Sequence, residues 1–192
     1  MTRHFHPAHR RQAIQWARNL IAHRFYVLDT ETTGLGASDE IVQIAILDGS
    51  GAAAMRQLVK PTIPIPPVAS AVHGIGDSDV EDAPSFKDIY IRLSTLLAGQ
   101  VVIAYNMDFD WRMLQQSASR YRLPAMRIGK RDCAMKQYAR FKGVRHSKGR
   151  NYVWHKLGAA AAQEGLQVTR AHDAFDDARL TLSLIHKMAE SR

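Results

Sequence analysis

Short apolar runs separated by turn signals predict the strands of a sheet in the first third of the chain. Residues 25–28 form a continuous apolar run, which is typical of a buried central strand. Residues 41–47 alternate in part, and residues 55–59 follow the turn signal at 48–51 as a returning strand. Residues 60–67 hold four prolines, so we expect an extended connection there. The pattern indicates an antiparallel meander.

Helical spacing of apolar residues dominates the rest of the chain. It predicts helices over residues 10–22, 86–97, 153–164 and 173–189, with a buried strand at 101–104 and a further helix that begins near Asp110. A meander followed by alternating helices and strands indicates an α/β domain with a mixed sheet. We expect residues 1–23 to form a tail and an amphipathic helix packed on a single domain of residues 24–192.

The charge of the chain is concentrated in one stretch. The net charge is +8, yet Arg120 to Lys156 contains twelve Lys or Arg and one acid, a local charge of +11. Such a concentration indicates a surface for nucleic-acid phosphates, with a solvated basic face as the alternative. Gly143, Ser147 and Gly149 lie among five cations and predict a mobile arm that orders on phosphate contact, made of Arg140, Lys142, Arg145, Lys148 and Arg150. Arg145, Lys148 and Arg150 are the expected substrate contacts.

The composition also indicates the cellular compartment of the protein. No apolar run approaches the roughly 18 to 20 residues that span a bilayer, and the N-terminus lacks the apolar core of a signal peptide. The one cysteine, Cys133, excludes an intrachain disulfide and a cysteine zinc cluster. We expect a cytoplasmic protein with no membrane partner.

Two carboxylates end the first apolar run. Asp29 and Glu31 are two residues apart, so on a strand both side chains project from the same face. A buried acidic pair is costly unless a cation lies between the carboxylates, which a bound metal would provide. Taken alone, the pair is better explained as an aspartate cap and a solvated glutamate in a turn rich in threonine and glycine.

Further candidate ligands occur at two later places. Asp110 follows the later buried strand, with Asp108 as a competing candidate, and Asp177 lies beside Asp176 in the last helix. Each of these aspartates could instead cap a helix. His172 and Asp177 are five residues apart, about 140° on a continuous helix. They can reach one cleft only if His172 precedes the helix.

Together these segments closely resemble the motifs of the DnaQ-like, DEDDh-type 3′–5′ exonuclease family. The first motif, apolar-Asp-x-Glu-Thr-Thr-Gly-Leu, is matched from Leu28 to Leu35. The second, His-Asn-x-x-Phe-Asp, ends at Asp110 and has Tyr105 in place of the common His, and the third, His-x-Ala-x-x-Asp, begins at His172. The resemblance spans roughly residues 24 to 188. It implies a ribonuclease-H-like fold with a mixed five-stranded sheet, an antiparallel meander plus parallel strands, flanked by helices.

The resemblance also implies the catalytic residues. Two Mg²⁺ or Mn²⁺ ions would be held by Asp29, Glu31, Asp110 and Asp177, and Asp29 would bridge them. His172 would act as general base, because an imidazole that titrates near neutrality can accept a proton from water.

Substrate contacts follow from the same resemblance. Glu31 and the backbone of Thr32 would recognise the terminal 3′-hydroxyl, while Leu35 and His73 would pack on terminal bases. The expected substrate contacts in these motifs are Thr32, Gly34, Leu35, His73 and Asn106.

The sequence thus predicts a metal-dependent exonuclease that releases 5′-mononucleotides from the 3′ end of DNA, with single-stranded DNA favoured. An exoribonuclease that trims RNA would use the same five residues, although the Thr32-Thr33 form of the first motif favours DNA. A proofreading subunit bound to a DNA polymerase, and a homodimer, also stay open.

Overall fold

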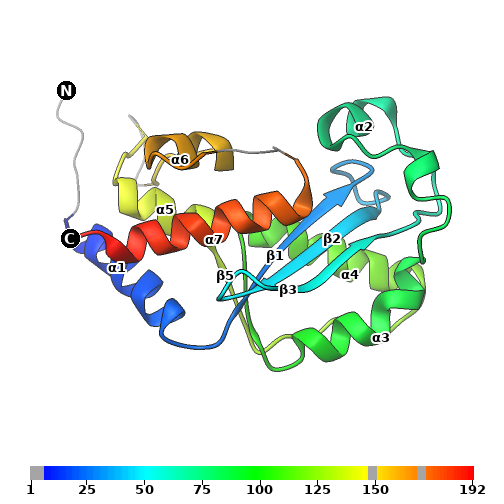
Figure 1. The fold of residues 1–192 in the computed structure, drawn as a ribbon, viewed down its shortest axis with the longest axis horizontal. Coiled ribbons are helices and arrows are strands. Elements are labelled where there is room, and N and C mark those ends of the chain that lie inside the picture. The colour runs from blue at the N-terminus through cyan, green and yellow to red at the C-terminus, as the bar shows by residue number, and fades with distance from the viewer. Residues whose placement is uncertain (1–6, 147–150, 168–171) are drawn as a thin grey trace.

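A five-stranded mixed sheet with the strand order β3-β2-β1-β4-β5 forms the centre of the computed structural model (Figure 1). The structure describes residues 7–146, 151–167 and 172–192. The strands are β1 (Tyr26–Thr32), β2 (Ile41–Asp48), β3 (Ala53–Leu58), β4 (Val101–Ala104) and β5 (Lys130–Cys133). β1 pairs antiparallel with β2 and parallel with β4, and β5 extends the parallel part. The predicted mixed sheet, a meander plus parallel strands, is confirmed.

Helices cover both faces of this sheet. They are α1 (Pro7–Ile21), α2 (Pro67–His73), α3 (Phe86–Leu97), α4 (Met107–Arg120), α5 (Ala134–Lys142), α6 (Leu157–Gln163) and α7 (Ala174–Glu190). One hydrophobic core lies between the sheet and α3 with α4, and a second lies between the sheet and α1, α5 and α7. Within the described ranges, no helix is both long and apolar enough to cross a membrane.

Alternation along β1 determines which layer the acidic residues face. Tyr26 and Leu28 pack in the core under α3 and α4, whereas Val27 packs in the core under α7. Full burial of a side chain such as Leu28 contributes roughly 1.5–3 kcal/mol, which fixes the strand in this orientation. Because alternate residues of a strand share a face, Asp29 and Glu31 follow Val27 towards α7.

Three predicted helix starts differ from the structure. The helix expected to begin near Asp110 begins at Met107. The first helix begins at Pro7, where proline suits an N-terminal turn, and not near residue 10. The helix predicted over 153–164 was too long, because α6 begins at Leu157. The residues before it are extended, with the Val153 N–H donating to the carbonyl of Val144.

Part of the basic stretch that was predicted to be mobile is regular structure. Arg140 and Lys142 lie in α5, whose buried stripe of Ala134, Tyr138 and Phe141 packs in the second core. These positions follow helical spacing, with Arg140 exposed on the outer face and Lys142 paired with Glu164 at 3.1 Å beside Tyr138.

Candidate active site

The acidic residues of the three motifs meet at one edge of the sheet. β1 carries Asp29 and Glu31 towards its carboxyl end, and α4 carries Asp110 in its first turn. β4 runs parallel to β1, so the helix that follows β4 starts at the same edge. Asp177 lies in the first turn of α7, and Figure 1 shows that end of α7 beside the end of β1.

Asp29 and Asp110 form the inner part of the cluster. The Thr30 hydroxyl donates a hydrogen bond of 2.9 Å to Oδ1 of Asp110, which orients this buried carboxylate. Burial raises the pKa of Asp110 to about 7. The pKa of Asp29 is raised well above its ordinary value by burial, and then by the nearby charges of Asp110, Glu31 and Asp177.

Glu31, His172 and Asp177 form the outer part. One ligand atom from each lies within 4.8 Å of the others. Burial, followed by the charges of Asp177 and Asp110, raises the pKa of Glu31 to about 8. The pKa of Asp177 is raised mainly by burial.

His172 precedes α7 and does not belong to it. Its φ is 62°, a left-handed conformation that a non-glycine residue rarely adopts. This turn separates the imidazole from the helical series of side chains, so the five-residue spacing does not keep it from Asp177. Sparsely populated backbone conformations of this kind cost roughly 1–3 kcal/mol.

The donor set fits hard divalent cations. Four carboxylates are gathered at one place, all with raised pKa values, and no Lys or Arg in the described ranges forms an ion pair with any of them. A group of anions without a cationic side chain is favourable only when protons or metal ions balance the charge. Oxygen ligands of this type suit Mg²⁺ or Mn²⁺.

The two competing aspartates point elsewhere. Asp108 is exposed, and its Oδ2 accepts a 2.6 Å hydrogen bond from Nζ of Lys136. Asp176 lies 3.8 Å from a guanidinium nitrogen of Arg179 on the same helix. Both are engaged by surface cations, whereas Asp110 and Asp177 face the cluster.

The loop after β1 presents Leu35 to solvent, with 77% of the residue exposed. The Thr32 hydroxyl donates to the carbonyl of Gly34, and Arg112 donates to the carbonyl of Leu35 at 3.1 Å. A Cβ on Gly34 would lie 2.7 Å from the Asp39 carboxylate, so close approach requires glycine here. The loop therefore holds an apolar side chain outward beside the acidic cluster.

The other expected substrate contacts differ in exposure. His73 is buried at the end of α2, where its Nδ1 accepts from the Ile75 N–H at 3.1 Å, and its ring lies near the backbone of Thr32 and near His172. Burial lowers the pKa of His73. Asn106 is exposed at the start of α4. Because the His73 ring is buried, it offers a nucleotide base far less surface than the expected stacking role would require.

Only one of the three basic residues named from sequence, Arg145, lies within the described part of the chain. Arg145 forms an isolated bridge with Tyr152, and its guanidinium lies 5.4 Å from the centre of the Tyr152 ring. Lys148 and Arg150 lie outside the described residues.

Sequence reasoning missed a group of residues that fixes the start of α7. Asp173 caps this helix by accepting from the backbone N–H groups of Phe175 and Asp176. The Gln43 amide and an Arg56 guanidinium nitrogen, 3.3 Å away, also bind the Asp173 carboxylate. Burial alone would raise the pKa of Asp173, but these partners hold it below its ordinary value. The available signal was Gln43 itself, a polar residue within an apolar strand.

Known proteins resemble this chain over nearly its whole described length. A family described as exonucleases matches residues 26–185. An uncharacterised exonuclease of Escherichia phage 186 is 42% identical over 169 residues, 85% of this chain and 87% of that protein. The DNA polymerase III subunit epsilon of Treponema pallidum is 33% identical over 168 residues, 85% of this chain and 75% of that protein. The solved structure of exonuclease X in complex with 5′-overhanging duplex DNA has 30% identity and a TM-score of 0.59, over 87% of this chain and 92% of that chain. The matched span includes β1, α4 and the start of α7.

Proposed function

The chain belongs to the DnaQ-like exonuclease family, and we propose that it removes nucleotides from the 3′ end of DNA, preferring single strands, and releases 5′-mononucleotides. Members of this family are phosphodiester hydrolases with a ribonuclease-H-like fold. The observation that carries the proposal is the convergence of five side chains from three distant segments: Asp29, Glu31, Asp110, His172 and Asp177.

Two divalent ions, Mg²⁺ or Mn²⁺, complete the proposed site. Asp29, Glu31, Asp110 and Asp177 would hold them. When bound, such ions stabilise negative charge on a phosphodiester and lower the pKa of water. The carboxylates must ionise to serve as ligands, so their raised pKa values mean that ion binding releases protons.

His172 accepts the proton of the attacking water in this proposal. Its ring lies at the exposed border of the cluster, with a nitrogen within 4.8 Å of carboxylate oxygens of Glu31 and Asp177. Exposure of the ring lets it pass the accepted proton to solvent. The left-handed backbone at His172 sets the direction in which its ring leaves the chain.

Recognition of a strand end is assigned to the residues after β1. Glu31 and the backbone of Thr32 would bind the 3′-hydroxyl, and Leu35 would pack on the last base. The support for this assignment is that the loop is braced by Arg112 and Asp39, so Leu35 is held in place before substrate arrives. A fixed apolar contact tolerates any base, which suits a sequence-independent exonuclease.

DNA is the proposed substrate because one relative is a subunit of a DNA polymerase and the solved neighbour is bound to duplex DNA. We also assign the reaction to the cytoplasm, since a buried free thiol at Cys133 suits a reducing compartment.

The test compares 5′-labelled DNA and RNA oligonucleotides of one sequence, with Asp29→Asn as the control. We expect a ladder of products shortened from the 3′ end, formed at least about tenfold faster on DNA. A faster ladder on RNA would overturn the substrate assignment, and internal cuts or release from the 5′ end would overturn the reaction itself.

A further inference from the structure

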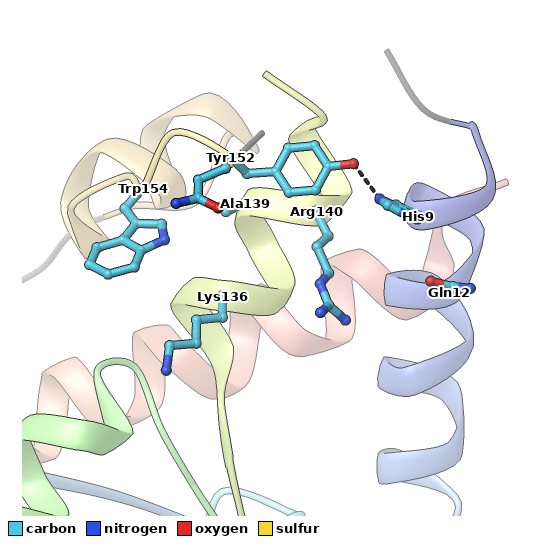
Figure 2. A pocket seen from close by; sticks show the side chains of 8 residues that line it. His9, Gln12, Lys136, Ala139, Arg140, Tyr152 and Trp154 are labelled. Carbon is cyan, nitrogen blue, oxygen red and sulfur yellow. Dashed lines mark hydrogen bonds between the residues drawn. The ribbon is translucent and has the colours of Figure 1, made fainter. Parts of the chain in front are cut away.

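A groove of about 420 Å³ lies between α1, α5 and residues 151–154, outside the acidic cluster. In Figure 2, Lys136 and Arg140 project from α5, with Tyr152 and Trp154 along one border and α1 on the other. The proposed reaction uses none of these side chains. The groove therefore raises the question of what it binds.

The cations of the groove are arranged for phosphates. Lys136 and Arg140 are four residues apart on α5, so they lie on one helix face about 6 Å apart along the axis. Both are exposed, and no carboxylate within the described ranges pairs with Arg140. Two neighbouring cations in an open groove match the backbone of a nucleic-acid strand.

The aromatic border is arranged for bases. Trp154 is 61% exposed, a large apolar surface facing solvent beside the two cations. Stacking on an exposed aromatic ring requires a base that is not enclosed in a duplex, because paired bases hide their faces. The combination of a basic groove and a stacking ring is the pattern of single-strand binding sites.

The border of the groove is held in place before any ligand binds. The Tyr152 hydroxyl pairs with Nδ1 of His9 at 2.5 Å, and the Arg145 guanidinium lies 5.4 Å from the centre of the Tyr152 ring. Further along, the Tyr105 hydroxyl donates to the carbonyl of His155 at 2.6 Å. Contacts to α1 and to the β4–α4 junction thus fix both ends of this border.

One contact joins the groove to α4, the helix that carries Asp110. Nζ of Lys136 lies 2.6 Å from the carboxylate of Asp108, and Asp108 is two residues before Asp110 in the first turn of α4. A strand that runs from the cluster past the first turn of α4 would meet Lys136 of the groove. The Asp108 carboxylate also partly neutralises Lys136, which leaves Arg140 as the main charge of the groove.

We propose that this groove binds the nucleotides upstream of the scissile phosphate, with Lys136 and Arg140 on the phosphates and Trp154 stacked on an unpaired base. The inference rests on the proposed exonuclease function and specifies its substrate as a single strand that extends several nucleotides from the cleaved end.

The test compares a substrate that reaches the groove with one that does not. Oligothymidylate of about 16 nucleotides covers the upper range of single-strand site sizes. The p-nitrophenyl ester of thymidine 5′-monophosphate occupies the cleavage site alone. For each variant we would measure the ratio of kcat/KM on the oligonucleotide to kcat/KM on the ester, and the Kd of a dye-labelled oligothymidylate.

The informative variants are Trp154→Ala and Arg140→Gln, and each should lower the ratio and weaken binding by about tenfold. Arg140→Gln should also reduce the slope of log affinity against log salt by about 0.7, the value for one phosphate contact on a single strand. Trp154→Phe, which keeps a stacking ring, should restore most of the loss. Arg92→Gln, the same change on exposed α3 across the sheet, should leave ratio, affinity and slope as in the parent protein.

Unchanged ratios and Kd values in both Trp154→Ala and Arg140→Gln, with melting temperatures equal to that of the parent, would overturn the groove assignment while leaving the exonuclease proposal intact. If the parent protein hydrolyses neither substrate, the proposed function fails, and the Kd measurements still decide whether the groove binds a single strand.

Discussion

Gln43 on β2 holds Asp173, the residue after His172, through a 3.2 Å hydrogen bond from its Nε2 to the carboxylate. The Oε1 of the same side chain accepts from the backbone N–H of Ala174 at 2.8 Å. Gln43 is also the cross-strand partner of Glu31 in the antiparallel pair of β1 and β2. A single pair of strand residues therefore connects a carboxylate on β1 with the start of α7.

Replacement of this amide tests its positioning role. Gln43→Leu keeps the volume but removes both hydrogen bonds, so His172 and Asp177 lose their fixed distance from Glu31. We expect kcat to fall by about 10–100-fold with KM changed little, as for outer-shell partners of metal sites. Gln57→Leu on β3, whose amide donates to the neighbouring Leu58 carbonyl, is the matched control. Equal effects of the two changes would mean that Gln43 acts only on stability.

Removal of the imidazole separates catalysis from metal binding. His172→Ala should lower kcat by about 10²–10⁴-fold, the usual contribution of a general base, because water must then lose its proton unaided. Mn²⁺ affinity, measured by calorimetry, should stay within a few-fold, since the carboxylates remain. His23→Ala, an exposed histidine after α1, should behave as the parent protein. Full activity of His172→Ala would remove the residue from the mechanism.

The stability of the metal-free protein should depend on pH in an unusual direction. The folded-state pKa of Glu31 is raised from 4.5 to about 8, so between these values the folded state binds more protons than the unfolded chain. The free energy of unfolding should therefore fall as pH rises from about 4.5 to about 8.

Mg²⁺ should reverse this trend, because it binds the ionised carboxylates and stabilises more at pH 8 than at pH 6. Glu31→Gln should flatten the metal-free trend, while Glu190→Gln at the exposed end of α7 should not. Thermal melts across pH, with and without Mg²⁺, measure both effects. Metal-free stability that rises over this window would contradict the clustered carboxylates.

Two neighbouring aspartates should respond in opposite ways to the same change. Asp110→Asn removes a proposed metal ligand and should lower activity by more than about 100-fold, beyond the range of outer-shell changes. Asp108→Asn releases Lys136 from its carboxylate partner, so activity should persist and oligonucleotide affinity should increase slightly with a steeper salt dependence. Hydrolysis and binding assays on the pair are the check. Loss of activity in Asp108→Asn comparable to that in Asp110→Asn would contradict the assignment of ligands.

The elements that were predicted correctly are those whose buried positions give a clear periodic pattern of apolar residues in the sequence. The strand at 25–28 and the helix at 86–97 are examples, because each buries an apolar run or stripe in a core. β5 gave no such signal, since Lys130 and Arg131 are exposed at the edge of the sheet. The helix α5 was not predicted, because its outward-facing Lys136 and Arg140 interrupt the apolar pattern.

The candidate site shows the same division. Motif order alone identified the five residues at its centre, because the spacing of those motifs follows the chain. The contacts that orient these residues leave no local pattern in the sequence. Gln43 and Asp173 are 130 residues apart, and nothing in the local sequence pairs them. The groove is equally nonlocal, since it requires α1, α5 and Trp154 to meet.

The most direct test of the central claim is hydrolysis of a 5′-labelled single-stranded DNA oligonucleotide by the parent protein and by Asp29→Asn, each with Mg²⁺ and with a chelator. The account predicts stepwise shortening from the 3′ end by the parent protein with Mg²⁺ alone, and 5′-mononucleotides as products. Shortening that persists in Asp29→Asn or in the presence of the chelator would contradict it.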